Sequence, residues 1–401
     1  MSQPNTSLDE ILNNWVAGQT ATELEWQHLA DEELASPQRA KAFGITRENV
    51  EEVIQARSHL FQAVYPNVLS LPSFGPIPQE IDTEAGEPGN LVETQFIASG
   101  SREIPQSKIE VALKAHQRCD PKLKIAISLW NLWLPLAMQL ASIRQQLGRP
   151  LIQGVLGGQG TGKTTLAAVL SLILSELGYR TLSLSLDDLY KTYDERQRLQ
   201  KKDSRLIWRG PPGTHDVELG LQVLDQLRSP LQPQPILVPR FDKSAWGGAG
   251  DRSTPEMVQS IDIVLFEGWF VGVRPIDARV FDASTPAPIE TSADRLFARD
   301  MNERLKDYVP LWERLDRLMV LYPSDYRQSQ QWRRQAEQQM IATGKSGMTD
   351  AQVDEFVEYF WRSLHPELFI TPLTQNSSFV DLVIEINPDH TTGAIYQPGK
   401  V

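Results

Sequence analysis

A short segment beginning at Gly157, GGQGTGKTT, combines glycine, lysine and threonine at a spacing that suits phosphate binding. Gly157, Gly162, Lys163 and Thr164 form the arrangement Gly-x4-Gly-Lys-Thr. Glycines allow successive backbone N–H groups to point at one anion, and a following helix presents its positive end to that anion. Lys163 would then reach the β- and γ-phosphates of a nucleotide, and the Thr164 hydroxyl would bind Mg²⁺. The segment therefore predicts a site for the phosphates of ATP.

The sequence on either side of this segment is what a phosphate-binding loop requires. An apolar run, Leu151 to Leu156, precedes it, and a helical run that ends at Gly178 follows it. The alternative, a glycine-rich turn with an incidental lysine, would not need both flanks. We expect ATP to contact the loop residues Gly158, Gln159, Gly160, Thr161, Gly162, Lys163, Thr164 and Thr165.

Two acidic residues, Asp187 and Asp188, follow a second apolar run in the sequence TLSLSLDDLY. Because the carboxyl ends of parallel strands meet at one edge of a sheet, these acids would lie beside the phosphate-binding loop. A carboxylate there can accept the proton of an attacking hydroxyl group. The alternative is an ordinary turn or helix cap, the common role of acids after a strand. The phosphate site in the same sheet favours the catalytic role.

A third apolar run, IDIVLFEG, ends in Glu267. A carboxylate at this position can bind Mg²⁺ directly or through water, whereas the alternative is a solvated strand end. Thr164 and Glu267 are the predicted metal ligands, and ATP and Mg²⁺ are the predicted cofactors.

These residues can meet only in a fold that brings the ends of several strands together. After Ser107, apolar runs alternate with helical stretches, which predicts an α/β fold with a doubly wound parallel sheet and helices on both faces. The predicted strands are Leu151 to Leu156, Thr181 to Leu186, Ile261 to Phe266, Leu318 to Tyr322 and Val380 to Ile386.

Three segments are expected along the chain. Residues 1–65 carry apolar side chains at helical spacing and predict a helical N-terminal appendage. Residues 66–106 are rich in Pro, Gly and Ser and predict a linker. Residues 107–401 would form the domain that carries the phosphate-binding loop.

Composition and charge narrow the classes of function. The formal net charge of −12 opposes nucleic-acid binding over a broad surface, because that mode needs clustered Lys and Arg. The most apolar window, Ile125 to Ala141, is interrupted by polar residues and a proline, so it predicts a buried helix and not a membrane span. The N-terminus lacks the pattern of a signal peptide, and the single cysteine, Cys119, excludes an intrachain disulfide. We expect a cytoplasmic protein that binds neither nucleic acid nor membrane.

Four motifs in chain order, GGQGTGKTT, SLDDLY, RGPPGTHD and FEGW, resemble those of the phosphoribulokinase, uridine kinase and pantothenate kinase group of P-loop kinases. Three further segments resemble D-glycerate 3-kinases of the plant and cyanobacterial type: VPRFDKSAWGGAGDR, NERLKDYVPLW and QWRRQAEQQMIATGKSGMTDAQVDEFV. The likeness runs from about Leu123 to His390. It implies a three-layer P-loop kinase domain and transfer of the ATP γ-phosphoryl group to the 3-hydroxyl of D-glycerate, as in the recycling of photorespiratory carbon.

The resemblance also implies roles for single residues. Asp187 matches the catalytic base of the uridine kinase group, and Asp188 would have a secondary role at most. Arg333 and Arg334 lie in a segment that resembles the lid, where an arginine closes over the phosphates, and Arg333 is preferred. The alternative for both arginines is a helix surface with mixed charges. The predicted catalytic residues are Lys163, Asp187 and Arg333.

His215 and Asp216 match the substrate loop of the family, although a histidine after a turn is as often structural. The carboxylate of glycerate would need a guanidinium or ammonium partner, and Arg209, Lys243 and Arg252 are the candidates. The alternative is that each of these three cations pairs with a nearby acid of the chain. The predicted substrate-binding residues are Arg209, His215, Asp216, Lys243 and Arg252.

Two other functions stay open at the level of sequence. A related P-loop kinase would act on a nucleoside, pantothenate or another small hydroxyl compound, and it would need a pocket for a base or a longer acid. An ATP-binding switch or scaffold, with the N-terminal helices as its effector, would need neither Asp187 nor the lid arginines. The dense charges of RFDKSAWGGAGDR favour a small charged acid as substrate. The oligomeric state is not indicated.

Overall fold

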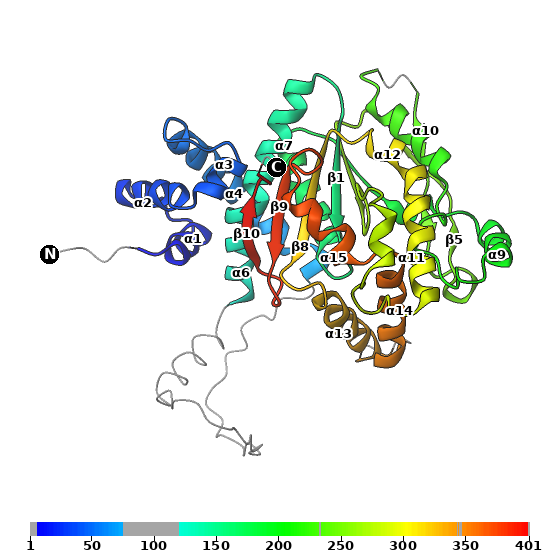
Figure 1. Ribbon diagram of the computed structural model, residues 1–401. Coiled ribbons are helices and arrows are strands. Elements are labelled where there is room, and N and C mark those ends of the chain that lie inside the picture. Colours follow the sequence, from blue (N-terminus) through cyan, green and yellow to red (C-terminus); the bar gives the residue numbers. More distant parts are fainter. Residues whose placement is uncertain (1–5, 75–119, 232–233, 343, 345–346, 400–401) are drawn as a thin grey trace, which may run out of the picture.

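The computed structural model of the protein describes residues 6–74, 120–231, 234–342, 344 and 347–399. Its centre is a six-stranded sheet with the strand order β10-β9-β8-β1-β7-β2 (Figure 1). All neighbouring strands are parallel except β10, which pairs antiparallel with β9 at one edge. The strands are β1 Leu151–Gly157, β2 Thr181–Ser185, β7 Ile263–Gly268, β8 Arg317–Pro323, β9 Leu382–Ile386 and β10 Thr392–Tyr396.

The α/β class and the five predicted strands are confirmed, with small shifts at the strand ends. Strand β10 was not predicted because its sequence, TGAIY, has little apolar character, and only Ile395 of it is buried. Two short antiparallel strand pairs lie outside the main sheet: β3 (Ile236–Val238) with β6 (Glu256–Val258), and β4 (Phe241–Asp242) with β5 (Asp251–Arg252).

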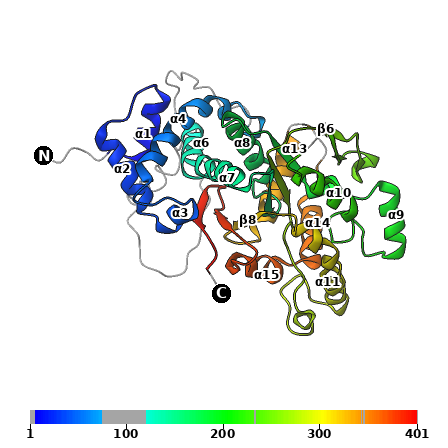
Figure 2. The ribbon, with the colours of Figure 1, turned by 90° about the horizontal axis from the view of Figure 1, so that it is seen from above.

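Helices cover both faces of the sheet and so form three layers with it (Figure 2). Side chains alternate between the two faces along β1, because Leu151 and Val155 belong to one apolar core and Ile152 and Leu156 to the other. The helices of the first layer and of the N-terminal segment are α1 Leu8–Val16, α2 Glu23–Leu34, α3 Pro37–Ala42, α4 Val50–Leu69, α6 Pro121–Ser128, α7 Leu134–Leu147 and α8 Lys163–Glu176. The later helices are α9 Tyr193–Lys202, α10 Val217–Arg228, α11 Ser292–Arg304, α12 Val309–Trp312, α13 Gln328–Ala342, α14 Asp350–Ser363 and α15 Pro366–Phe369.

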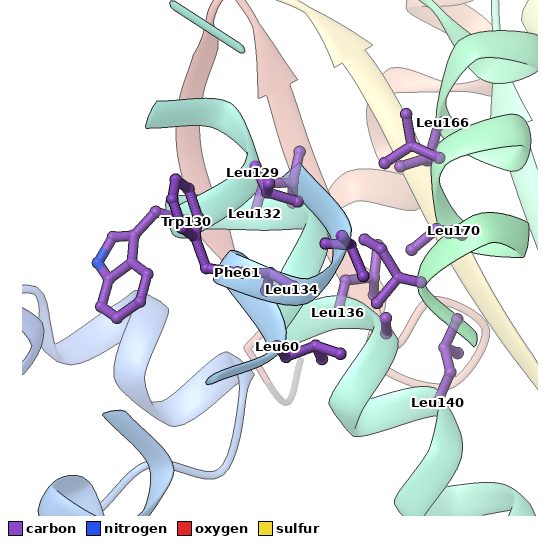
Figure 3. Packing of buried hydrophobic residues seen from close by; sticks show 14 of the residues in the cluster. Leu60, Phe61, Leu129, Trp130, Leu132, Leu134, Leu136, Leu140, Leu166 and Leu170 are labelled. Carbon is purple, nitrogen blue, oxygen red and sulfur yellow. The ribbon is translucent and has the colours of Figure 1, made fainter. Parts of the chain in front are cut away.

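The N-terminal helices share an apolar core with the sheet domain. Leu60 and Phe61 of α4 lie among the leucines of the helix that follows Pro121, and these leucines in turn reach α8 (Figure 3). The Trp15 ring of α1 lies 5.1 Å from the ring of Trp130, measured between centroids. The predicted domain limit at residue 65 falls inside α4, which continues to Leu69. Residues 75–106 of the predicted linker, and Cys119, lie outside the described residues.

The apolar window from Ile125 to Ala141 forms the predicted buried helix. Pro121–Leu147 is long and apolar enough to cross a membrane by length and composition alone, but 61% of its most apolar window is buried inside the protein. The helix is not uniform, since Leu129–Trp133 adopts a π turn, η2, between α6 and α7. Pro135 has no N–H for the carbonyl of the preceding turn, which explains why the backbone widens there.

An ion pair is buried where the N-terminal helices meet this π turn. Arg57 is 0% exposed and Glu33 is 2% exposed, and Arg57 Nη1 lies 2.6 Å from Glu33 Oε2. The Arg57 guanidinium also lies over the Trp130 ring, 5.0 Å from its centroid. Arg39 Nε approaches the second Glu33 oxygen at 3.4 Å. Glu33 therefore neutralises a guanidinium that has no access to water.

We expect Glu33→Gln to lower the free energy of unfolding by about 3–5 kcal/mol, because it leaves the buried charge of Arg57 unpaired. The measurement is equilibrium unfolding in urea. Glu32→Gln, on the same helix and partly exposed, is the matched control and should change stability by less than about 0.5 kcal/mol. Equal unfolding midpoints for the two variants would contradict a stabilising role for this pair.

Candidate active site

The glycine-rich loop joins β1 to α8, and its conformation or its close neighbours require glycine at several positions. Gly160 and Gly162 adopt φ angles of +77° and +83°, in the left-handed region that favours glycine. A Cβ atom at Gly160 would lie 2.6 Å from the Cβ atom of Trp332 on α13. Lys163 Nζ donates a hydrogen bond of 2.9 Å to the carbonyl oxygen of Gly158. The lysine is thus held over the loop whose backbone would surround the phosphates.

The ammonium group of Lys163 faces acids from two neighbouring strands. Strand β7 pairs with both β1 and β2, so Glu267 at its end lies beside the loop and Asp187 follows one strand further. Burial lowers the pKa of Lys163, and the charges of Glu267 and Asp187 oppose that effect only in part. The structure therefore brings together the three residues that were predicted to meet at this edge of the sheet.

The two consecutive acids have different surroundings in the 3₁₀ helix η3 (Leu186–Leu189). Asp188 accepts a hydrogen bond of 3.0 Å from the backbone N–H of Ser185 and pairs with Arg240 Nη1 at 2.8 Å. Asp187 instead faces a cleft, where its Oδ2 lies 2.7 Å from Lys243 Nζ. Asp188 is committed to holding the local backbone, and Asp187 has the position of a base.

Opposing effects set the ionisation of Asp187. Burial raises its pKa, but the positive charge and hydrogen bond of Lys243 and a hydrogen bond from Tyr190 lower it by more, so the pKa lies below the usual range. Asp187 is consequently ionised at neutral pH and can accept a proton.

Lys243→Ala is expected to raise the pKa of Asp187, because the burial would remain while the adjacent positive charge would be lost. The acid limb of a plot of kcat/KM against pH should then move to higher pH, since the protonated carboxyl cannot act as a base. Lys201→Ala, on the exposed surface of α9, is the control. An acid limb that stays in place in the Lys243 variant would show that this limb does not report Asp187.

One cleft of about 960 Å³ at the carboxyl ends of the central strands collects most of the predicted residues. The predicted residues on its wall are Gln159, Gly160, Lys163, Thr164, Asp187, Arg209, Lys243, Glu267 and Arg333. The remaining predicted residues of the phosphate-binding loop do not line this cleft: Gly158, Thr161, Gly162 and Thr165.

Three predicted substrate contacts lie outside the wall of the cleft. His215 is 1% exposed, its Nδ1 lies 2.8 Å from the hydroxyl of Tyr308, and its ring stacks on Tyr190. Burial lowers the pKa of His215 to about 3, so it is neutral at physiological pH. Asp216 caps α10 and pairs with Arg252 at 2.7 Å. In this structure these residues hold the segment RGPPGTHD in place and do not face the cleft.

Comparison with known proteins agrees with this geometry. A chloroplastic D-glycerate 3-kinase of Arabidopsis thaliana is 33% identical over 220 residues, which are 53% of this chain and 46% of that protein. An uncharacterized kinase of Schizosaccharomyces pombe is 32% identical over 221 residues, which are 53% of this chain and 79% of that kinase. A probable ATP-dependent kinase of Saccharomyces cerevisiae is 30% identical over 246 residues, which are 57% of this chain and 81% of that kinase. The chain belongs to the P-loop kinases of the glycerate 3-kinase type.

A solved structure supports the same assignment. D-glycerate 3-kinase from Cryptococcus neoformans is 29% identical, with a TM-score of 0.58, and the match covers 65% of this chain and 99% of that one. No protein-family model matches the chain. The chain spans about half the length of the Arabidopsis relative.

The two arginines that were predicted to belong to a lid, Arg333 and Arg334, are placed differently on α13. Arg333 lines the cleft, with its Nη2 2.5 Å from Glu337 Oε1 and its guanidinium over the ring of Phe356. Arg334 pairs with Asp354 on α14, outside the cleft. Arg333 therefore faces the cleft, and Arg334 does not.

The oxygen donors of the kinase site fit Mg²⁺. The Thr164 hydroxyl and the Glu267 carboxylate line the same cleft as Lys163. In the part of the chain that the structure describes, no group of three or more acidic, histidine or cysteine side chains could hold a metal by itself. This suits Mg²⁺, which in kinases takes one or two protein ligands and completes its shell with phosphate oxygens and water.

Sequence reasoning did not identify the side of the cleft formed by α9. Its sequence, YDERQRLQKK, has no buried residue and reads as a solvated charged helix. The signal that could have identified it is position, because α9 begins directly after the catalytic motif SLDDLY. The residues of α9 that line the cleft are Tyr193, Arg196, Gln197, Leu199 and Gln200.

Proposed function

We propose that this protein transfers the γ-phosphoryl group of ATP to the 3-hydroxyl of D-glycerate and releases ADP and 3-phosphoglycerate. The observation that carries the proposal is the single cleft in which the Asp187 carboxylate faces the phosphate-binding loop and Lys163. Two relatives that bear the name D-glycerate 3-kinase support glycerate as the acceptor.

The residues of the cleft would divide the work of transfer. Asp187 would accept the proton as the acceptor oxygen forms its bond to the γ-phosphorus and the bond to the β,γ-bridging oxygen of ATP breaks. Lys163 and Arg333 would offset negative charge on the transferring group. Mg²⁺, held by Thr164 and Glu267, would supply further neutralisation of phosphate charge when bound. In this scheme Asp187 takes up the one proton that is transferred, and the other side chains stabilise negative charge.

The test is a coupled ADP-release assay on a panel of hydroxy acids, polyols, nucleosides and pantothenate, followed by phosphorus NMR of the product. D-glycerate should give the highest kcat/KM, and the product should carry phosphate on C3. Faster turnover of a nucleoside or pantothenate than of D-glycerate would show that this compound, and not glycerate, is the substrate. ATP binding without turnover of any compound would favour the switch or scaffold. The recycling of photorespiratory carbon stays a prediction that depends on turnover of D-glycerate. The cytoplasmic location stays a prediction from the sequence.

A further inference from the structure

Two arginines line the catalytic cleft without an acidic partner. Arg196 lies on α9, and Arg209 lies in the loop before α10. Of the other cations of the cleft, Lys243 pairs with Asp187 and Arg333 with Glu337. Lys163 donates to the carbonyl oxygen of Gly158 and lies in the field of Glu267 and Asp187. Within the described part of the chain, neither Arg196 nor Arg209 forms an ion pair. Two guanidinium groups with no acid in ion-pair contact therefore face the same space, and Asp251 offsets the charge of Arg196 only from a longer distance.

Backbone carbonyl groups of one loop position the guanidinium groups of Arg196 and Arg209, and Arg196 Nη1 also donates to the carbonyl oxygen of Lys191. Arg196 Nη2 donates to the carbonyl oxygens of Ala249 at 2.7 Å and Gly250 at 2.5 Å. Arg209 Nη1 donates to Gly248 at 2.7 Å and to the same Ala249 carbonyl at 3.0 Å. Because the two arginines share an acceptor, their guanidinium groups lie next to each other.

Both guanidinium groups also pack over one aromatic ring, that of Phe241. The Arg196 and Arg209 guanidinium carbons lie 5.2 Å and 5.5 Å from the centroid of the Phe241 ring. Burial lowers the pKa of Arg196, and the charge of Arg209 lowers it further. Holding two guanidinium groups together costs free energy, and an anion bound between them would recover it. The carbonyl groups and the ring leave part of each planar fork of N–H donors free for such an anion.

This pair lies on the acceptor side of the cleft. The Phe241 ring packs on Tyr190 at 5.0 Å between centroids, and Tyr190 hydrogen-bonds to Asp187. Only the rings of Phe241 and Tyr190 therefore separate the arginine pair from the Asp187 carboxylate. The phosphate-binding loop approaches α13 at Trp332. Helix α9 lies at an outer edge of the domain, away from α13 (Figures 1 and 2). Nucleotide phosphates would thus meet Lys163 and Arg333 on one side of Asp187, and the pair would meet the acceptor on the other.

We propose that Arg196 and Arg209 together bind the carboxylate of the acceptor, which makes the kinase selective for small hydroxy acids over neutral alcohols. This inference rests on the proposed function, because it takes the acceptor hydroxyl to lie at Asp187. Of the predicted carboxylate partners it retains Arg209, and it adds Arg196. Arg252 is excluded because Asp216 and the carbonyl oxygen of Tyr190 occupy it outside the cleft.

The test uses the full chain with Arg196→Gln and Arg209→Gln, each compared with Arg198→Gln. Arg198 is an exposed residue of the same helix that does not line the cleft, so it controls for loss of positive charge on α9. Steady-state rates are measured with D-glycerate and with glycerol, and ATP KM is measured for every variant. Calorimetric titration of D-glycerate into each protein without ATP gives a readout that does not depend on turnover.

Each of the two cleft variants should lose about 30-fold or more in kcat/KM for D-glycerate, with a similar loss of affinity in calorimetry and an ATP KM within about twofold of wild type. The preference for glycerate over glycerol should fall by the same factor. A merely structural role would lower both substrates together, because both arginines brace the loop of Ala249. An unchanged preference in both variants overturns the inference while leaving the proposed function intact.

The proposed function fails separately, if wild type does not phosphorylate D-glycerate. The inference is then tested in the same way with the hydroxy acid that the panel shows to be the best substrate. A wild-type enzyme that phosphorylates only uncharged acceptors, or that binds no hydroxy acid in calorimetry, overturns both.

Discussion

Lys163→Ala and Thr164→Ala should each lower turnover by about 1000-fold or more while the protein stays folded. Lys163 acts on charge that develops on the transferring phosphoryl group, and Thr164 would bind the metal that carries the nucleotide. Neither residue fills the apolar core, because Thr164 is exposed and the Lys163 ammonium contacts the carbonyl oxygen of Gly158. The measurement is kcat in the ADP-release assay, accompanied by circular dichroism and thermal unfolding of each variant.

Lys201→Ala is a suitable control for the lysine variant, since Lys201 is exposed on α9 and does not line the cleft. It should keep wild-type kcat and thermal stability. If either loop variant kept near-wild-type turnover, the glycine-rich loop would have no part in the transfer step.

Asp187→Asn should lower kcat by at least about 100-fold with little change in ATP KM. Base catalysis by a positioned side chain typically contributes about 10²- to 10⁴-fold, and an amide cannot accept the proton. The asparagine would keep the shape of the side chain but would lose the ion pair with Lys243. A pH profile of the residual activity should also lose its acid limb, because the titrating carboxyl is gone.

The adjacent Asp188→Asn variant is the matched control, because it should affect stability more than activity. Asp188 caps the start of η3 and pairs with Arg240, so its loss should cost about 1 kcal/mol of stability and much less activity than the loss of Asp187. A larger loss of kcat in Asp188→Asn than in Asp187→Asn would move the assignment of the base by one residue.

The phosphate-binding loop could be recognised in the sequence because its function resides in contiguous backbone. The glycines permit the turn, and the lysine and threonine stand at fixed offsets from it, so spacing alone carries the geometry. The strands of the central sheet could also be predicted from the sequence, because they are buried on both faces and form continuous apolar runs such as LIQGVLG. The location of the acids after β2 and at the end of β7, beside the phosphate-binding loop, could be predicted because parallel strands end at one edge of the sheet.

The roles of the charged side chains in the cleft depend on partners from distant parts of the chain. Spacing alone could not distinguish Asp187 from Asp188, whereas the fold gives Arg240 to one and Lys243 to the other. His215 looked like a substrate contact, but Tyr308, which lies far along the chain, holds its ring in a buried site.

The sequence by itself determined the fold class, the nucleotide site and the strand ends at which the chemistry occurs, because local backbone preference and apolar periodicity encode them. Only the tertiary structure decided which arginines stay unpaired in the cleft and so can bind an anion. Arg252 and Arg209 look alike in the sequence, and Arg196 resembles any residue of an exposed charged helix. Their difference lies in whether folding brings a carboxylate, such as that of Asp216, within reach of each guanidinium, and that is a property of three-dimensional distance.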